Sequence, residues 1–383
     1  MRFPEFSGEW EETTLGKISE ITKGSGISKD QLSEQGSPCI LYGELYTKYK
    51  SEIIDVVYSR TELETSSLVK SKANDVIIPC SGETAIDIST ARCVPFNNIL
   101  LGGDLNIIRL KHDDGGFFAY QLNGARKKEI ARVAQGVSVV HLYGENLKHI
   151  RVYHPVIEEQ KKIIRLLSLI DERIATQNKI IEDLKKLKSA IAERVYNCCT
   201  YQLYRIGDVI EQVSKRNTSM SIDKVLSVSN KLGFINQSEQ FEDRIVASED
   251  TSNYKIVYKD DFAYNPARIN VGSIARLKHF NKGIVSPMYI CFRVKQGIVL
   301  DYLEYFFTTN YFFYEMQKRL EGSVRQCLSF EGLCNIPIYI PNLDEQQKMG
   351  RKVSVIMEKI DIENRYLDSL KMQKQYLLRQ MFI

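Results

Sequence analysis

Two long stretches of the chain carry a heptad pattern of apolar side chains. One follows Pro155 and the other follows Pro341. In both, apolar residues recur at steps of three, four and seven, the spacing that aligns them along the seam of a coiled coil. An acidic pair stands near the start of each stretch, as is common at a helix N-terminus. The pattern predicts two long helices, over 157–199 and 342–383.

The two predicted seams have polar gaps at matching positions. Gln177 corresponds to Glu363, and Lys188 corresponds to Lys374. Antiparallel pairing places Lys188 against Glu363 and Gln177 against Lys374, whereas unstaggered parallel pairing stacks the two lysines, a like-charge contact. We therefore predict an antiparallel pair in this register. The predicted seam residues are Ile170, Ile174, Ile181, Leu184, Lys188, Ile191, Ile356, Ile360, Glu363, Leu367, Leu370 and Leu377.

The chain also repeats itself at a constant offset of 186 residues. Gly136 matches Gly322, Tyr153 matches Tyr339, and the register continues without a gap to the ends of both helices. A period this long indicates two copies of a whole half-protein rather than a solenoid. Each copy is a domain followed by a helix. The predicted segments are a first domain over 1–156, a central helix over 157–199, a second domain over 200–341 and a C-terminal helix over 342–383.

Inside each domain, short β-branched or aromatic runs alternate with Gly, Asn and Ser, as in mixed α/β domains. Strands are expected over 53–57, 75–79, 105–110, 224–228, 254–258 and 288–294. One helical stretch is expected in each domain, over 116–134 and 301–320. The fold class predicted is α+β: two similar mixed α/β domains separated by a two-helix antiparallel coiled coil, with a pseudo-twofold internal repeat.

Composition and charge limit the classes of protein to which this chain can belong. With 43% hydrophobic and 26% charged residues, the chain is globular. A net charge of +4 without a polybasic segment means that any nucleic-acid contact comes from local patches. Eight cysteines without a CxxC pair indicate packed thiols in a reducing compartment. Neither a membrane-length apolar run nor a signal-peptide pattern is visible, so we expect a cytoplasmic protein with no membrane partner.

Catalytic and metal-binding patterns are missing from the sequence. The run Asn265-Pro-Ala-Arg268 lacks the second proline and the aromatic residue of an adenine-methyltransferase motif, and no phosphate-binding loop, zinc-protease or nuclease pattern occurs. Glycine pairs at 24–26 and 102–104 are interpreted as turns. His141, His149 and His154 have neither ligand spacing nor carboxylate partners in the sequence. We predict no catalytic residue and no metal site.

Polar and basic residues on the predicted loops are the remaining candidates. Arg, Lys, Asn and Gln on loops can read base edges, and Tyr and Lys can contact sugar and phosphate. Solvated loops have similar composition, so each residue alone is a weak candidate, but two parallel sets on duplicated domains strengthen the case. The candidate DNA-binding residues are Lys23, Lys29, Tyr42, Glu44, Ser81, Thr84, Ser138, Lys215, Arg216, Asn230, Asn265, Arg268, Asn270, Arg325 and Gln326.

These patterns resemble the specificity subunits of type I restriction–modification systems. The opening PEFSGEWEETTLGKI, the twice-repeated glycine-to-proline segment and the helix starts EEQKKI and DEQQKM match that family, over essentially the whole chain. The resemblance implies two target-recognition domains alternating with two helical conserved regions. It further implies that each domain binds one half of a split, asymmetric site in double-stranded DNA, with the helices fixing the spacing.

The resemblance also implies partners and individual roles. Two methyltransferase subunits, which carry S-adenosylmethionine, would dock on the helices, and motor and nuclease subunits would join them, while this chain has no catalysis and binds no cofactor. Phosphate contacts are expected from Lys23, Lys29, Lys215 and Arg216. Base-edge contacts are expected from Glu44, Ser81, Thr84, Asn265, Arg268, Asn270, Arg325 and Gln326. Two alternatives stay open: a coiled-coil adaptor joining two protein-binding domains without DNA, and a stand-alone nuclease or methylase, which the missing motifs disfavour.

Overall fold

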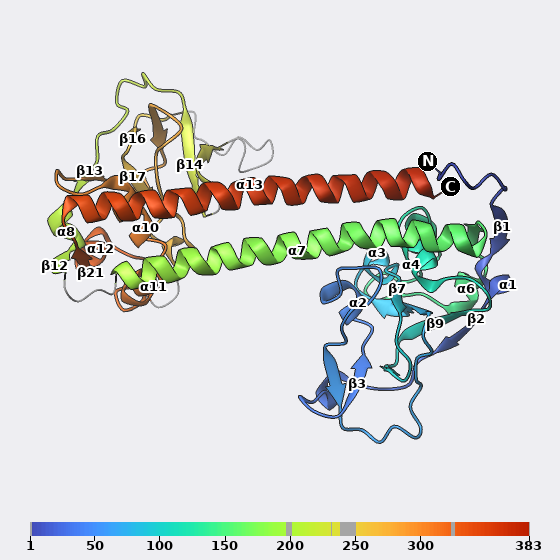
Figure 1. The fold of residues 1–383 in the computed structure, drawn as a ribbon. Helices are drawn as coiled ribbons and strands as arrows, with labels where there is room; N and C mark the ends of the chain where they lie inside the picture. Colours follow the sequence, from blue (N-terminus) through green and yellow to red (C-terminus); the bar gives the residue numbers. More distant parts are fainter. Residues whose placement is uncertain (1, 197–200, 231, 238–249, 323–325, 383) are drawn as a thin grey trace. The chain divides into compact units, whose positions relative to one another are not determined.

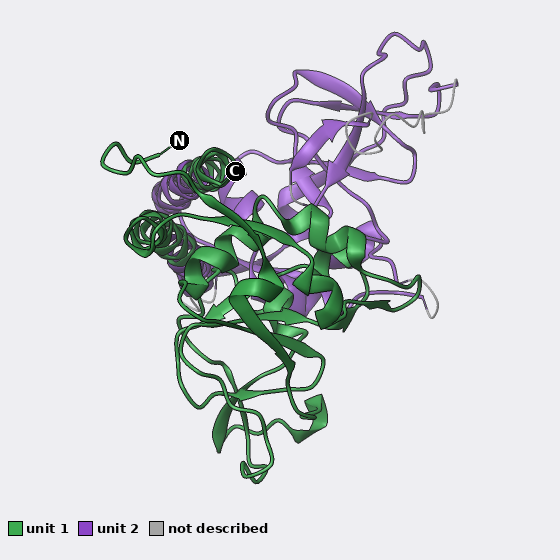
Figure 2. Ribbon diagram, turned by 90° about the vertical axis from the view of Figure 1, so that its right-hand side faces the viewer, with its two compact units in different colours: residues 1–179, 365–383 green, residues 180–364 purple. Residues whose placement is uncertain are grey.

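The fold is α+β, and the chain separates into two compact units (Figure 2). The computed structural model describes residues 2–196, 201–230, 232–237, 250–322 and 326–382. Unit 1 comprises Met1–Lys179 with Arg365–Ile383, and unit 2 comprises Ile180–Asn364. Each unit therefore contains one domain, half of one long helix and half of the other. The four predicted segments divide the chain differently, because each long helix packs one half against each domain.

Unit 1 contains four small sheets. Its largest sheet has the strand order β2-β9-β5-β7 and a second has the order β4-β3-β8, while β1 pairs with β11 and β6 pairs with β10. The strands are β1 (Glu11–Thr14), β2 (Ser19–Lys23), β3 (Ser37–Ile40), β4 (Ser59–Thr61), β5 (Asp75–Pro79), β6 (Ser81–Gly82), β7 (Arg92–Val94), β8 (Leu100–Leu101), β9 (Leu105–Leu110), β10 (Val140–His141) and β11 (Arg151–His154). The short helices are α1 (Leu15–Ile18), η1 (Lys29–Gln31), α2 (Glu44–Thr47), α3 (Ala85–Ile88), α4 (Gly115–Asn123), α5 (Lys127–Val133) and α6 (Gly144–Lys148).

Unit 2 repeats this arrangement. Its sheets have the orders β13-β20-β17-β18 and β15-β14-β19-β16, and β12 pairs with β21. The strands are β12 (Gln202–Arg205), β13 (Ile210–Val213), β14 (Val225–Ser229), β15 (Gly233–Asn236), β16 (Lys255–Tyr258), β17 (Phe262–Tyr264), β18 (Ile274–Arg276), β19 (Lys282–Val285), β20 (Ile290–Val294) and β21 (Pro337–Ile340). The short helices are α8 (Ile206–Val209), η2 (Ile269–Val271), α10 (Leu300–Phe306), α11 (Asn310–Gln317) and α12 (Phe330–Cys334).

The duplication extends to individual side chains. Asp75 on β5 forms a two-point ion pair with Arg109 on β9 (2.9 and 2.8 Å). Asp261 on β17 forms the same pair with Arg293 on β20 (2.7 and 3.0 Å). Both carboxylates are buried, so in each unit the pair neutralises a charge that is costly to bury alone. The second copy is therefore a structural copy as well as a sequence copy.

The two long helices run antiparallel within each unit. They are α7 (Ile157–Tyr196) and α13 (Leu343–Met381), coloured green and red in Figure 1. In unit 1, Ile163 and Leu167 from the start of α7 share a core with Met381 from the end of α13. In unit 2, Tyr196 from the end of α7 shares a core with Met349 from the start of α13. The predicted antiparallel pairing is therefore confirmed.

The predicted register of the helices is wrong at Lys374. It placed Lys374 opposite Gln177, but the Lys374 ammonium lies 2.6 Å from Asp171, six residues earlier on α7. Six residues are about 9 Å along a helix. Glu363 forms an ion pair with Lys359 on its own helix rather than the predicted one with Lys188. The predicted seam residues are nevertheless all buried or half-buried in the structure.

The domains correct several predictions of secondary structure. The strands predicted over 75–79 and 105–110 are β5 and β9, and those over 224–228, 254–258 and 288–294 overlap β14, β16 and β20. No strand forms over 53–57: Ile53 makes a single bridge to Cys93, and Val56 is exposed. The helix predicted over 116–134 is two helices, because α4 ends at Asn123 with Gly124 as its C-cap. The helix predicted over 301–320 is divided where Thr309 caps α11.

Candidate nucleic-acid interface

One edge of the largest sheet of unit 1 gathers several of the predicted DNA-binding residues. β2 and β5 end at this edge and β9 begins there, since Lys23 aligns with Asn106 and Pro79 aligns with Leu105. Burial raises the pKa of Cys80, the residue after β5, to about 11, and the positive charge of Lys23 opposes that shift. Ser81 follows directly, and the pairing of β6 with β10 brings the loop with Ser138 beside it. Lys23 and Ser138 are exposed, whereas Ser81 is largely buried.

A cavity of about 780 Å³ opens beside this edge. It is lined by residues from three segments within 26–32, 41–48 and 103–104, and it includes the predicted Lys29, Tyr42 and Glu44. The glycine pairs form the turns there: the backbone N–H of Gly24 donates to the carbonyl of Leu105 (3.0 Å). A Cβ on Gly24 would lie 2.0 Å from the Gly102 carbonyl oxygen, so only glycine allows this approach.

Glu44 has a structural role in the lining of this cavity. Its carboxylate is buried and accepts hydrogen bonds from the backbone N–H of Leu41 (3.0 Å), from Lys48 (2.6 Å) and from the Ser59 hydroxyl. These contacts use both oxygens. Glu44 therefore holds the segment that carries Tyr42, and the prediction that Glu44 reads base edges loses its support.

Residues that the sequence did not single out also line the cavity. Tyr46 is half-buried, and its hydroxyl lies between the α2 segment and Gly82 of β6. Burial raises its pKa, and the charges of Asp87 and Glu83 act in the same direction. Asp104 also lines the cavity; it is exposed and has a positive φ of 57°. Tyr46 lies close in sequence to the predicted Tyr42 and Glu44, whereas Asp104 gave no signal in the sequence.

Thr84 is engaged locally. Its hydroxyl accepts the backbone N–H of Asp87 (3.1 Å) as the cap of α3 and donates to the Asp87 carboxylate (2.6 Å). Thr84 remains exposed at the surface. Its first role is to begin α3, and only its methyl group and exposed face are available to a ligand.

The predicted residues of unit 2 form two groups. Asn230, Asn265, Arg268 and Asn270 lie around η2, where Ser273 donates to the Val228 carbonyl (2.9 Å) and so joins the end of β14 to the start of β18. The backbone N–H of Leu328 donates to the carbonyl of Pro266 (3.0 Å), which brings the segment with exposed Gln326 to the same loop. Arg325 lies outside the described residues.

The second group in unit 2 is Lys215 and Arg216, beside β16. The Lys215 carbonyl accepts the backbone N–H of Ile256 (2.8 Å), and the Arg216 guanidinium donates to Asn253 (2.8 Å). Both side chains are exposed. Unit 2 therefore presents two basic or polar surfaces rather than a single cluster.

Asn265 and Arg268 differ in what they can contact. The Asn265 side chain is buried and accepts the backbone N–H of Ala267 (3.1 Å), so it holds the turn. Arg268 is exposed, and within the described residues its guanidinium forms no ion pair. Arg268 and Asn270 therefore present side-chain donors at the surface with no partner among the described residues, while Asn265 shapes the loop that carries them. The prediction that Asn265 reads base edges stays a prediction, with the amide oxygen engaged in the turn.

The metal-ligating side chains, the thiols and the lengths of the helices bear on the chemistry of the part of the chain that the structure describes. No three His, Cys, Asp or Glu side chains among the described residues gather in a way that could hold a metal ion. His154 does have a carboxylate partner, contrary to expectation: its Nδ1 lies 3.0 Å from Asp113. The six described cysteines are free thiols. No helix in the described ranges combines the length and apolarity of a membrane span.

Comparison with known proteins agrees with this architecture. The family model described as "Type I restriction modification DNA specificity domain" matches residues 7–186 and 200–372. The MjaVIII type I restriction enzyme specificity subunit of Methanocaldococcus jannaschii is 23% identical over 99% of this chain and 92% of its own length.

Two solved structures share the fold over almost their whole length. The S subunit of a type I restriction–modification system from M. genitalium aligns with a TM-score of 0.64 and 16% identity, covering 100% of this chain and 99% of that one. A chain from a study of complex assembly and conformational transition of the type I R-M system aligns with a TM-score of 0.56 and 13% identity, covering 98% of both. The duplicated domains and the family match over both copies place this chain in the type I restriction–modification DNA specificity family.

Proposed function

We propose that this chain is the specificity subunit of a type I restriction–modification complex and that each domain reads one half of a bipartite, asymmetric site in double-stranded DNA. The observation that supports this proposal best is that two domains of the same topology carry different side chains on their loops. At equivalent sheet edges, unit 1 presents Lys23, Ser138 and a tyrosine-lined cavity, whereas unit 2 presents Arg268 and Asn270. Two domains with the same frame and different donors read two different half-sites.

Bivalent attachment explains how a chain of small net charge holds DNA. Once one domain is bound, the second contact is effectively intramolecular, so two weak contacts combine into a tight one. In this proposal, the paired helices α7 and α13 set the number of base pairs between the half-sites and dock two methyltransferase subunits. S-adenosylmethionine belongs to those subunits, which extrude the adenine for methylation. Motor and nuclease subunits complete the assembly, which acts on DNA in the cytoplasm.

Mapping of methylated adenines tests the proposal. The chain is combined with its methyltransferase partner, unmethylated genomic DNA is treated with the complex, and the modified positions are sequenced. We expect a single sequence with two short specified parts separated by a fixed unspecified spacer. Methylation without sequence preference, or at one continuous short site, would overturn it. Stable assembly with partner subunits but no duplex binding would favour the adaptor function instead.

A further inference from the structure

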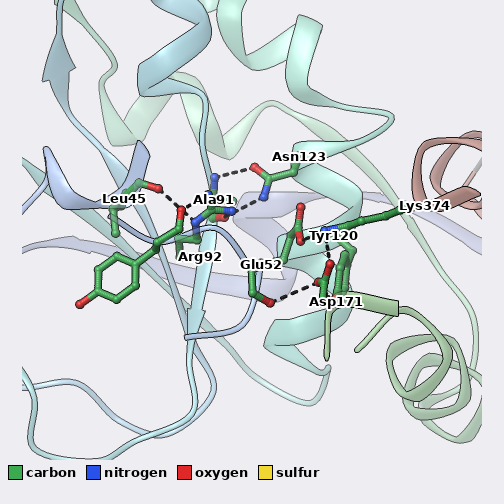
Figure 3. Close-up of polar contacts among 10 residues, drawn as sticks. Leu45, Glu52, Ala91, Arg92, Tyr120, Asn123, Asp171 and Lys374 are labelled. Atoms are coloured by element: carbon green, nitrogen blue, oxygen red, sulfur yellow. Dashed lines mark hydrogen bonds and ion pairs between the residues drawn. The ribbon is translucent and has the colours of Figure 1, made fainter. Parts of the chain in front are cut away.

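A buried ion cluster connects the end of the chain to the first domain (Figure 3). The Lys374 ammonium, on α13, lies 2.5 Å from the Glu52 carboxylate and 2.6 Å from the Asp171 carboxylate. The Tyr120 hydroxyl donates to the second oxygen of Asp171 (2.7 Å). Lys374, Glu52 and Asp171 have side-chain exposures of 13, 9 and 10%. Four separate elements of unit 1 therefore meet at one shielded set of charges.

A second buried cation extends this cluster toward the candidate interface. Arg92 donates to the backbone carbonyls of Leu45 (3.1 Å) and Tyr49 (2.9 Å). Burial lowers the pKa of Arg92, and the charges of Glu52 and Asp171 oppose that shift, so the guanidinium lies in their field. The backbone carbonyl of Glu52 also accepts the N–H of Cys93 (2.8 Å). The segment from Leu45 to Glu52 is thus fixed at both ends by buried charges.

That segment lines the cavity of the candidate interface. Tyr46 and Lys48 belong to the segment, and Tyr42 lies three residues before its start. Side chains that contact DNA must be held within a fraction of an ångström of their productive positions by the groups behind them. Besides Glu44, this support comes from Arg92 and Glu52, and the counter-charge of Glu52 comes from a residue 322 positions later in the chain.

The equivalent lysine of unit 2 has no such arrangement within the described ranges. Lys188 occupies the position of Lys374 in the repeat, and within the described residues it forms no ion pair. Burial lowers its pKa, and the neighbouring Lys185 lowers it further. Asp171 corresponds to Met357, which carries no charge. Among the residues that the structure describes, the ion cluster is therefore found in unit 1 and has no counterpart around Lys188.

We propose that Lys374 is a positioning residue for the first recognition domain: through Glu52, and with Arg92, it holds the 45–52 segment so that this domain can read its half-site. This inference rests on the proposed function and deepens it. Recognition of one half-site depends on the C-terminal part of α13, while recognition of the other does not depend on Lys188 in the same way.

Half-site discrimination in the complex with methyltransferase subunits tests this inference. Duplexes carry the mapped site with the first half, the second half or neither half scrambled, and R268A identifies the half read by unit 2. We expect E52Q and K374M to lower discrimination at the unit 1 half by about tenfold or more, the size of a base contact. Discrimination at the unit 2 half stays within about twofold. K374R keeps the positive charge, so it retains more discrimination at the unit 1 half than K374M does.

Two matched lysines serve as controls. K371M removes an exposed lysine one turn earlier on α13, and K188M removes the equivalent lysine of unit 2, and both leave the unit 1 half unaffected. E52Q preserves the shape of the side chain, so it gives an answer even if K374M unfolds. Equal loss at both halves, or no loss with E52Q, overturns the inference. Absence of sequence-specific binding by the wild-type complex would instead overturn the proposed function.

Discussion

The side-chain carbonyl of Gln346 accepts a hydrogen bond from the backbone N–H of Val299 (2.8 Å), which fixes the start of α13 to the start of α10. Its amide donates to the Pro341 carbonyl (2.9 Å). Gln160 makes the same two contacts in unit 1, to Asp114 (3.0 Å) and Pro155 (2.9 Å). Both glutamines are buried. The repeated Pro-to-Gln motif in the sequence is therefore the joint between each domain and its helix.

Replacement of Gln346 by Leu should loosen this joint. The change leaves the Val299 N–H and the Pro341 carbonyl buried without their partner, which costs about 1–3 kcal/mol of unfolding free energy. We expect the urea midpoint of unit 2 to fall without a change in the m-value. Gln373→Leu, at an exposed position of α13, is the control and should have little effect. An unchanged midpoint for Q346L would mean that the joint contributes no stability.

The stability of unit 1 should fall as pH rises through the titration of His154. The hydrogen bond to Asp113 raises the pKa of His154, although burial opposes the rise. A histidine whose pKa is higher in the folded state stabilises the protein fully below its unfolded value near 6.5, and this contribution disappears above the folded value. Burial raises the pKa of Asp113, but hydrogen bonds from His154 and Gln160 outweigh it and lower the pKa, so the carboxylate stays ionised through this window.

The measurement compares wild type with His154→Asn. We expect the difference in unfolding free energy between them to be larger at about pH 5 than at about pH 9, because only the wild type loses the charged pair. His149→Asn removes an exposed histidine of unit 1 whose ring makes no ion pair among the described residues, and serves as the control. If the difference in unfolding free energy does not change with pH, the contact between His154 and Asp113 contributes through packing only.

The sequence predicted the repeat and the helix direction because both follow from local periodicity. Polar residues interrupt the two heptad patterns at matching positions, such as Lys188 and Lys374. These interruptions limit how the two helices can pair, even when the structure of the domains is unknown. The register depended on more: Lys374 pairs with Asp171 and with Glu52, a domain residue that no heptad pattern includes. The register of α7 against α13 therefore depends on contacts between the helices and the domain, which a comparison of the two heptad patterns does not include.

The candidate interface was predicted at the level of loops rather than side chains. Glu44 and Asn265 have the right chemistry for base edges, but each is buried and hydrogen-bonded to nearby backbone. Composition cannot distinguish a carboxylate that holds a loop from one that reads DNA, because both occur in polar turns. Burial separates them, and burial depends on the folded domain.

Gly136, one of the two repeated glycines, should not tolerate a side chain. Its φ is 116°, and a Cβ there would lie 2.2 Å from the carbonyl oxygen of Val139. Gly136→Ala therefore strains the turn that begins the loop with Ser138, at a cost of about 1–3 kcal/mol. Differential scanning calorimetry should show a lower midpoint for the unit 1 transition. Gly8→Ala, at a position with open space around it, is the control and should leave the midpoint unchanged.

Substitutions of Arg268 and Asn265 should distinguish a side chain that contacts DNA from a side chain that stabilises its loop. Arg268 is exposed, so Arg268→Ala should lower affinity for the unit 2 half-site by about 1–3 kcal/mol while the unfolding free energy stays the same. Asn265 is buried and holds the backbone N–H of Ala267, so Asn265→Ala should lower stability by about 1–3 kcal/mol, with a loss of affinity that follows the distortion of the loop. Fluorescence-anisotropy titrations with half-site-scrambled duplexes, run beside urea unfolding, measure both quantities. If R268A weakens binding equally for every sequence, Arg268 contacts phosphate and the base contacts belong to other residues of this loop, with Asn270 the first to test.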